Sequence, residues 1–502
     1  MLAIIQSASL VGVEGRPVRI EVHVGNGLPS FTMVGLPDAS CREARDRVRA
    51  AVLSSEYQWP MRRVTVNLAP SGFPKIGTSL DLAIGVGMLQ AGGDVPAEAC
   101  ERWAFLGEVG LDGSLRSVRG VVPLVAALRH RVRGVVVPAA AHAEAALVPG
   151  VEVRCAPDLS TVVRALRGET PWPDPPDPPP RQTTAEPDVL DVKGQPVARE
   201  VLEIAAAGGH HLLLAGPPGA GKTLLATRLP GLLPDLDDDE ALEVTSIHSA
   251  AGARVDGQLI RRPPFRAPHH NASTVSLIGG GTAAMHPGEI SLAHRGVLFA
   301  DELGEFAPSV LDALRQPIEE GRVRISRARG SANYPSRFQF VAATNPCPCG
   351  PEPTGCRCSE AGLARYRRRL SGPLLDRFDL RLHVGPPDAS SILGEADGEP
   401  SAVVARRVAA ARRVAAERGY GLNASLRSAE LDAIAPLTRP ATRLLEHLVR
   451  TGKLTGRGVE RIRRVARTIA DLAGDSGVLG EEHVATAVAV RVPSPSGIQV
   501  AS

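Results

Sequence analysis

The stretch that decides the fold reads His211-Leu-Leu-Leu-Ala-Gly-Pro-Pro-Gly-Ala-Gly-Lys-Thr223. Its first five residues predict a buried strand, and the residues that follow it have helical spacing. The part between them matches the pattern G-x-x-x-x-G-K-[ST] in full, in the strand–turn–helix context that this pattern requires. An incidental glycine-rich turn is the alternative, and both flanking elements argue against it. We therefore predict a loop whose amides, lysine and hydroxyl bind phosphates and Mg²⁺, formed by Gly216, Pro217, Pro218, Gly219, Ala220, Gly221, Lys222 and Thr223.

Two further apolar runs end in polar residues. Val297 to Ala300 is followed directly by Asp301 and Glu302, and a later run from Phe338 ends near Asn345. Asp301 is expected to help hold Mg²⁺, and Glu302 to polarise the attacking water. Asn345 is a candidate for orienting that water against the γ-phosphate. A strand capped by two solvated acids is the alternative for Asp301 and Glu302, and the complete phosphate loop upstream argues against it.

The chain divides at a proline-rich segment. Thr170-Pro-Trp-Pro-Asp-Pro-Pro-Asp-Pro-Pro-Pro180 cannot sustain helix or sheet and favours an extended connector. Before it, period-two runs such as Val18 to Val24 alternate with helical spacings such as Arg42 to Leu53, and after residue 401 the spacing is helical throughout. The predicted class is α/β, with an N-terminal α+β domain (1–168), a linker (169–190), an α/β core (191–385) and a helical lid (386–502).

Composition sets broad limits on the class of protein. Of 502 residues, 43% are hydrophobic and 22% charged, and the net charge of +3 does not by itself indicate nucleic-acid binding. No apolar run reaches the roughly 18 residues that span a bilayer, and the first ten residues lack the cationic start of a signal peptide. Seven cysteines do not form a disulfide framework. We expect a cytoplasmic protein that does not contact membranes.

Four of the cysteines form a C-x-C-x₆-C-x-C cluster, made of Cys347, Cys349, Cys356 and Cys358. Four thiolates on one short loop suit a tetrahedral, structural Zn²⁺ site, although the spacing is not the usual C-x₂-C pair. A set of reduced thiols, or a loop sensitive to oxidation, is the alternative.

Phosphate loop, Asp-Glu strand, Thr-Asn strand and helical lid follow one another as they do in AAA+ ATPases, which the chain resembles. More narrowly, it resembles the magnesium-chelatase-like ComM/YifB family over essentially its whole length. The resemblance implies ATP and Mg²⁺ as cofactors and a homo-oligomer, a hexameric ring. It is carried by Phe265-Arg-Ala-Pro-His-His270, Gly288-Glu-Ile-Ser-Leu-Ala-His294, Asn345-Pro-Cys-Pro-Cys-Gly350, Leu370-Ser-Gly-Pro-Leu-Leu-Asp-Arg-Phe-Asp379 and Arg463-Arg-Val-Ala-Arg-Thr-Ile-Ala-Asp-Leu472.

Two further residues are candidates for the nucleotide site, and three histidines lie between the phosphate loop and the Asp-Glu strand. By the resemblance, Arg377 matches the arginine finger that reaches a neighbouring subunit's ATP, and Arg457 matches the lid arginine that contacts nucleotide. Both would place a guanidinium where charge builds on the transferring phosphoryl group. Without the resemblance, either is equally well a surface arginine. We interpret His269, His270 and His294 as packing or nucleotide-sensing residues in preference to metal ligands.

The segment from Gly321 to Arg329 alternates arginine with β-branched residues, which predicts a strand with one basic face. The resemblance implies that a hairpin at this position projects into the pore of a ring, as in the helicase-like branch of AAA+ proteins. Arg327 and Arg329, near its tip, are candidates for gripping a DNA backbone. A solvated basic face is the alternative.

In the N-terminal domain, the stretches from Asn67 to Ala83 and from Gly107 to Gly113 resemble the Lon-protease-type domain with its ribosomal-S5-like fold. Ser79 falls where that protease has its nucleophile, and Val122 falls where the base lysine would be. Lys75 belongs to the loop and does not match the base. Because a serine without a general base is weakly nucleophilic, the domain is expected to be non-proteolytic.

Three functions follow from these observations. The first is a ring-forming ATPase that remodels DNA, resembling ComM-type branch-migration helicases. The second is a chelatase-like motor subunit, or another remodelling ATPase that does not act on DNA. A chelatase motor requires partner subunits, and the Lon-like domain looks foreign to that role. The third is an ATP-dependent protease, against which the valine at position 122 argues.

Overall fold

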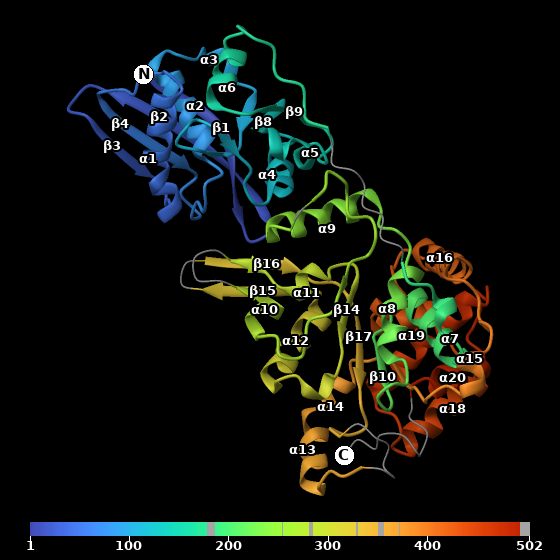
Figure 1. The fold of residues 1–502 in the computed structure, drawn as a ribbon. Helices are drawn as coiled ribbons and strands as arrows, with labels where there is room; N and C mark the ends of the chain where they lie inside the picture. Colours follow the sequence, from blue (N-terminus) through green and yellow to red (C-terminus); the bar gives the residue numbers. More distant parts are fainter. Residues whose placement is uncertain are drawn as a thin grey trace.

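The computed structural model describes residues 1–177, 186–253, 255–280, 285–327, 330–349, 356–370 and 372–491. Two successive α/β regions are followed by a group of helices (Figure 1). The predicted α/β class is therefore confirmed. Within the described residues, no helix has both the length and the apolar character needed to cross a membrane.

The N-terminal region is built on a seven-stranded mixed sheet of order β3-β4-β2-β1-β5-β8-β9. Strand β2 shows why the alternating pattern forms a strand: Val18, Ile20 and Val22 are fully buried, while the residues between them face outward. The strands of this sheet are β1 (Leu2–Val11), β2 (Glu14–Gly25), β3 (Ser30–Val34), β4 (Arg63–Ala69), β5 (Trp103–Phe105), β8 (Gly134–Pro138) and β9 (Glu152–Ala156). A short hairpin joins β6 (Glu108–Val109) and β7 (Leu115–Arg116).

Helix α2 (Asp81–Gly92) is apolar on nearly every side and packs between the sheet and α1 (Ala39–Ser54). A helix buried all round has no polar face to show, which matches the near absence of charge in its sequence. The other helices of this region are α3 (Ala97–Cys100), α4 (Val121–Leu128), α5 (His142–Ala145) and α6 (Leu159–Leu166). Residues 171–177 have no regular secondary structure, and 178–185 lie outside the described residues.

The second region is built on a five-stranded sheet of order β11-β14-β17-β10-β18, whose neighbouring strands all run parallel. Its strands are β10 (Leu212–Ala215), β11 (Phe265–Arg266), β14 (Val297–Ala300), β17 (Gln339–Thr344) and β18 (Leu380–His383). Three of them are the core strands predicted from apolar runs. Because the strands are parallel, the residues after β10, β14 and β17 meet at one edge of the sheet.

Helices and a hairpin surround this sheet. The helices are α7 (Pro196–Gly208), α8 (Lys222–Leu232), α9 (Asp238–Ala251), α10 (Thr274–Ile278), α11 (Glu289–Leu292), α12 (Pro308–Glu320), α13 (Glu360–Arg369) and α14 (Gly372–Leu375). The short pair β12 (Gly279–Gly280) and β13 (His286–Pro287) is antiparallel. Strands β15 (Arg322–Arg327) and β16 (Gly330–Pro335) form the predicted hairpin beside the sheet (Figure 1).

The C-terminal helices, two of which pack against α7, lie on the opposite side of the sheet from the hairpin (Figure 1). They are α15 (Ala389–Leu393), α16 (Ser401–Glu417), α17 (Ser428–Ile434), α18 (Arg439–Arg450), α19 (Gly456–Leu472) and α20 (Glu481–Ala489). Two polar contacts tie α19 to the core. Arg461 pairs with buried Asp379 at 2.6 Å, and the Thr468 hydroxyl lies 2.7 Å from His210 Nε2.

The N-terminal region contacts the core through α4 and through the turn between β1 and β2. The backbone N–H groups of Gly120 and Val122 donate to the carbonyl and hydroxyl oxygens of Ser249, at 3.1 and 3.3 Å. At the β1–β2 turn, buried Val13 packs in an apolar cluster that includes Tyr334 of the hairpin. The position predicted to correspond to a protease's lysine is therefore an interdomain contact.

Candidate nucleotide-binding site

The loop between β10 and α8 borders an open cleft of about 370 Å³. Gly219 and Gly221 have φ values of +78° and +88°, in the left-handed region that favours glycine. A Cβ on Gly216 would lie 2.1 Å from the Val384 carbonyl oxygen, so only glycine fits there. The cleft is lined by Pro218, Gly219, Gly221, Lys222, Thr223, Leu224, Asp301, Glu302, Thr344 and Asn345. Residues far apart in the sequence are thus brought together at one cleft.

Lys222 is the first residue of α8 and is 8% exposed. Its Nζ donates to the carbonyl oxygens of Gly216 and Pro217, both at 2.8 Å, and to Asn345 Oδ1 at 3.0 Å. Burial lowers the pKa of Lys222, while the nearby carboxylates of Asp301 and Glu302 act in the opposite direction. The arrangement places one ammonium group between the phosphate loop and the end of β17.

Thr223 and Asp301 meet across the cleft. The Thr223 hydroxyl donates to Asp301 Oδ2 at 2.8 Å, and Asp301 Oδ1 accepts from the Glu302 N–H at 2.9 Å. Oxygen atoms that bind one Mg²⁺ at about 2.0–2.1 Å in neighbouring octahedral positions lie about 2.9 Å apart. The separation between the Thr223 hydroxyl and the Asp301 carboxylate therefore fits a shared magnesium ion.

Glu302 adopts φ +52°, a left-handed backbone conformation that is uncommon for a residue with a side chain. Its Oε2 lies 3.0 Å from Nδ1 of His270, and the rings of His269 and His270 are 4.1 Å apart. His294 lies elsewhere: it is buried, 3.1 Å from a Glu243 oxygen, and it accepts the N–H of Arg337. Of the three histidines singled out in the sequence, His270 contacts a residue of the cleft.

Tyr366 of α13 is a contact that sequence reasoning missed. Its hydroxyl donates to the backbone oxygen of Asn345 at 3.1 Å and lies 3.1 Å from the Thr344 hydroxyl. Gln195 was also missed, and its Nε2 donates to the Ala220 carbonyl oxygen at 2.8 Å. Neither residue belongs to a local pattern, because each reaches the site only through the tertiary fold.

Arg377 and Arg457 are not among the residues that line the cleft. Arg377 pairs with Glu319 at the end of α12, with 2.7 Å between Nη2 and Oε1. Burial lowers the pKa of Arg377, and the positive charges of Arg315, Arg461 and Arg457 lower it further, against the effect of Glu319. Arg457 is exposed at the start of α19.

Three family models match the chain. Those described as magnesium chelatase, subunit ChlI, and as the C-terminal part of that subunit match residues 188–392 and 398–491, and one described as subunit ChlI of Mg-chelatase matches residues 20–141. The protein YifB of Salmonella typhimurium is 43% identical over 493 residues, covering 98% of this chain and 97% of its own. Competence protein ComM of Haemophilus influenzae is 42% identical over 503 residues, with the same coverage. The chain belongs to the magnesium-chelatase-like ComM/YifB family.

Similarity of this ComM/YifB-family chain to a chelatase subunit itself is lower and less extensive. The magnesium-chelatase 38 kDa subunit of Acidiphilium rubrum is 25% identical over 295 residues, covering 54% of this chain and 79% of its own. The family model that matches the N-terminal domain also carries a chelatase description. The sequence alone had suggested that this domain is foreign to a chelatase. The family model shows that the domain does not separate this chain from chelatases.

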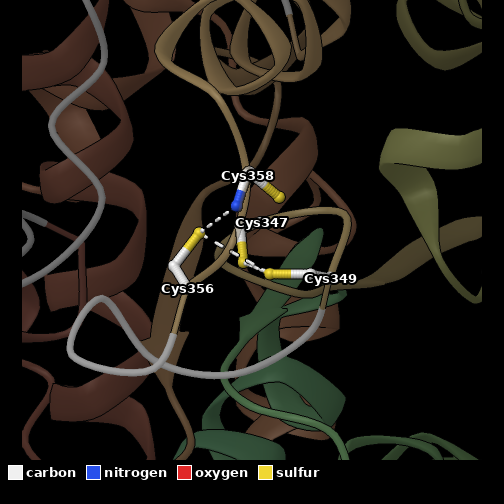
Figure 2. A group of neighbouring side chains, drawn as sticks. All are labelled: Cys347, Cys349, Cys356 and Cys358. Atoms are coloured by element: carbon white, nitrogen blue, oxygen red, sulfur yellow. Dashed lines mark hydrogen bonds between the residues drawn. The ribbon is translucent and has the colours of Figure 1, made fainter.

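In this ComM/YifB-family chain the four clustered cysteines lie just beyond the nucleotide cleft. The Sγ atom of Cys349 is 3.2 Å from that of Cys347 and 3.6 Å from that of Cys356. All four Sγ atoms, including that of Cys358, lie within 4.8 Å of one another (Figure 2). Cys347 is buried, Cys349 is exposed, and Cys356 and Cys358 are half-buried.

The Lon-like pattern of the N-terminal domain does not form a Ser–Lys pair. The Ser79 hydroxyl donates to the Ala8 carbonyl oxygen at 3.1 Å. Lys75 Nζ instead donates to the carbonyl oxygens of Pro70 and Phe73, the latter at 2.9 Å. Among the described residues, no general base is hydrogen-bonded to Ser79. That the domain is non-proteolytic stays a prediction.

Of the two predicted DNA-contacting residues, Arg327 is the last residue of β15. Arg329 and the side chain of Arg327 lie outside the described residues. On β15, Arg322 and Arg324 are exposed, whereas Val323 and Ile325 are buried, so the strand has the basic face predicted from its alternation.

Proposed function

We propose that the chain is an ATP-hydrolysing AAA+ motor that works as a homo-oligomeric, hexameric ring and remodels DNA. The observation that carries the proposal is the meeting of Lys222, Asp301 and Asn345 at one edge of the parallel sheet, beside a complete phosphate loop. A cation, a carboxylate and an amide at one cleft are the groups that phosphoryl transfer needs.

Nucleotide binding depends on the loop and its lysine. The loop amides and Lys222 bind the β- and γ-phosphates. When nucleotide binds, phosphate oxygens replace the carbonyl oxygens that Lys222 Nζ contacts in this structure. Thr223 and Asp301 hold Mg²⁺, as their 2.8 Å oxygen separation allows. The bound ion supplies positive charge next to the phosphates.

Hydrolysis depends on Glu302 and Asn345. Glu302 accepts a proton from the attacking water, and the Asn345 amide orients that water against the γ-phosphate. His270, at 3.0 Å from the Glu302 carboxylate, positions it. Because Asn345 also contacts Lys222, the residue that orients water is tied to the residue that binds phosphate.

Arg377 and Arg457 support the ring. Arg377 lies away from the cleft of its own chain and pairs with Glu319, whose side chain is 57% exposed. The Arg377 side chain itself is 12% exposed, so it must leave Glu319 and its partly buried position to reach a neighbouring subunit's phosphate. Arg457 supplies a second guanidinium from the lid. Each nucleotide site therefore includes positive charges that come from outside the phosphate loop.

DNA as substrate is supported by the basic face of β15 and by ComM, a relative whose name marks it as a competence protein. Arg327 and Arg329 would contact the phosphate backbone, together with the exposed Arg322 and Arg324 of β15. In a ring, six such hairpins would face one central channel.

The test is ATPase activity measured with and without single-stranded, duplex and branched DNA. We expect stimulation by at least one of them, weakening as salt rises. The double variant Arg327→Ala/Arg329→Ala should lose most of the stimulation, while the charge-matched control Arg443→Ala/Arg450→Ala on α18 should keep it. Equal stimulation of both variants would contradict the hairpin's role.

A chelatase-like motor that does not act on DNA is the second candidate, and the descriptions of the matching family models favour it. ATP turnover that no DNA structure stimulates would support it over the first candidate. Both candidates share the same nucleotide chemistry.

A further inference from the structure

Cys347, Cys349, Cys356 and Cys358 lie at the junction between the end of β17 and the start of α13. Figure 2 shows the sulfur atoms of Cys347, Cys349 and Cys356 turned toward one another, with that of Cys358 close by. From the described residues on either side of this segment, we propose that the four thiolates hold one structural Zn²⁺, and that this ion fixes the position of Asn345 in the nucleotide cleft.

The sulfur separations favour a single tetrahedral ion. With Zn–S bonds of about 2.3 Å, the sulfur atoms of a tetrahedral site lie about 3.8 Å apart. The two separations given above, 3.2 and 3.6 Å, and the 4.8 Å upper bound for the whole set, bracket that value. A disulfide needs about 2.05 Å between sulfur atoms, which is far shorter.

The chemistry of the set points to zinc. Four thiolates fill all four positions of a tetrahedral ion and leave none for water, which is the pattern of a structural site. Binding forms four Zn–S bonds and releases the thiol protons to solvent. The Cys358 N–H also lies 3.5 Å from the Cys356 sulfur, a weak contact of the kind that orients a ligand.

The two ends of the cysteine segment lead directly to the nucleotide site. Asn345, which contacts Lys222, comes two residues before Cys347. Ser359, which caps α13 by accepting the Gly362 N–H, comes immediately after Cys358. An ion bound by both pairs of cysteines therefore holds the end of β17 against the start of α13.

Tyr366 gives this clamp a second point of contact. It lies on α13, is 5% exposed, and hydrogen-bonds to Thr344 and to the Asn345 backbone at 3.1 Å. Its ring packs on Gly304, where an added Cβ would lie 2.3 Å from the ring. Tyr366 holds Asn345 through hydrogen bonds to Thr344 and to the Asn345 backbone, and the zinc holds it through Cys347, two residues later. Asn345 therefore depends on the metal for its position.

The primary test is the zinc content of the full-length chain, purified without a metal-affinity tag. We expect one zinc per chain, and strong thiolate-to-metal absorption after Co²⁺ replacement. Cys356→Ser/Cys358→Ser should remove the zinc, Cys358→His should retain it, and the control Cys100→Ala/Cys155→Ala, at two buried cysteines of the N-terminal region, should leave it unchanged. A wild-type chain without zinc, or with iron in its place, would overturn the assignment.

The positioning role is tested by hydrogen exchange, which requires no turnover. Removal of zinc, by chelator from the wild-type chain or by Cys356→Ser/Cys358→Ser, should speed exchange in peptides spanning residues 339–347 and 360–369 at least tenfold. Peptides of the N-terminal sheet should not change. Unchanged exchange at 339–347 in a zinc-free chain would overturn the clamp.

The consequence for turnover rests on the proposed function. Zinc removal should lower the kcat for ATP at least tenfold and change the Kd for Mg·ATP less than threefold, because Lys222 and the phosphate loop stay in place. An equal loss in both would overturn the specific role of Asn345. A wild-type chain that contains zinc but does not hydrolyse ATP would refute the proposed function, while zinc content and exchange would still decide the metal site.

Discussion

Each α/β region of this chain buries one lysine at a loop that precedes a helix. Lys75 in the N-terminal region is fully buried, and its Nζ is taken up by two carbonyl oxygens of its own loop and by the Phe73 ring at 4.3 Å. Lys222 in the core also bonds to two loop carbonyls, but the side-chain amide of Asn345, directly after β17, and two carboxylates share its cleft.

The difference teaches that burial of a cation does not mark a functional site. Burial lowers the pKa of both lysines. Lys222 lies beside a cleft of about 370 Å³ and beside acids that can hold a metal. Lys75 closes a loop, whereas Lys222 has partners that a phosphate can replace.

The largest effect that tests this comparison is expected at Lys222. Lys222→Met should abolish measurable ATP turnover and weaken Mg·ATP binding at least 100-fold, because phosphate oxygens lose their cation; that factor is about 3 kcal/mol. Lys75→Met, the matched removal of a buried ammonium, should leave the Kd within twofold. Fluorescent-nucleotide titration measures both, and equal losses would contradict the distinction.

A second effect concerns whether each lysine's surroundings are formed by one chain alone. The pocket of Lys75 is complete within one chain, whereas the nucleotide site is proposed to need Arg377 from a neighbour. Arg377→Ala should lower kcat about 100-fold, or about 3 kcal/mol in transition-state stabilisation. Mixing Arg377→Ala with Lys222→Met subunits, which retain Arg377, should restore part of the turnover. No restoration in mixed rings would place the arginine in its own subunit's site or outside catalysis.

A third effect concerns stability of the N-terminal region. Lys75→Met leaves buried carbonyl oxygens without donors, which should cost about 2 kcal/mol of unfolding free energy. All three tryptophans, Trp59, Trp103 and Trp172, belong to the N-terminal region or directly follow it, so tryptophan fluorescence reports its unfolding. An unchanged urea midpoint would show that Lys75 does not hold its loop.

The smallest effect is a pH dependence in the core. Burial lowers the pKa of His211 to about 4, with Arg461 and His210 lowering it and Asp379 raising it. The unfolded chain takes up a proton near pH 6.5 and the folded chain does not, so stability falls as the pH falls from 6.5 towards 4. From pH 7 to 5.5 the loss should be about 1 kcal/mol.

Chemical denaturation followed by circular dichroism measures this loss, and His211→Gln removes the titrating group. The variant should lose less stability than the wild type between the two pH values. The His211 Nδ1 accepts the Phe340 N–H at 2.9 Å, which requires the neutral ring. An identical loss in wild type and variant would assign the pH response to other groups.

The sequence predicted those parts of the fold and of the site whose residues lie close together in the chain. The strand and loop that carry Lys222, and the strand that ends at Asp301, have patterns within a few residues, and both could be predicted. The cysteine cluster was visible because its members are close in the chain. The contact of Tyr366 with Asn345 and that of His270 with Glu302 join separate segments, and no local spacing marks them.

The most direct test of the central claim compares binding and turnover of Mg·ATP in the wild-type chain and in Glu302→Gln. The variant keeps Lys222, Thr223 and Asp301, so its Kd for Mg·ATP should match that of the wild type. Its kcat should fall at least about 100-fold, because the amide cannot take the proton of the attacking water. A wild-type chain that fails to bind Mg·ATP, or a variant that turns over at the wild-type rate, would contradict the account.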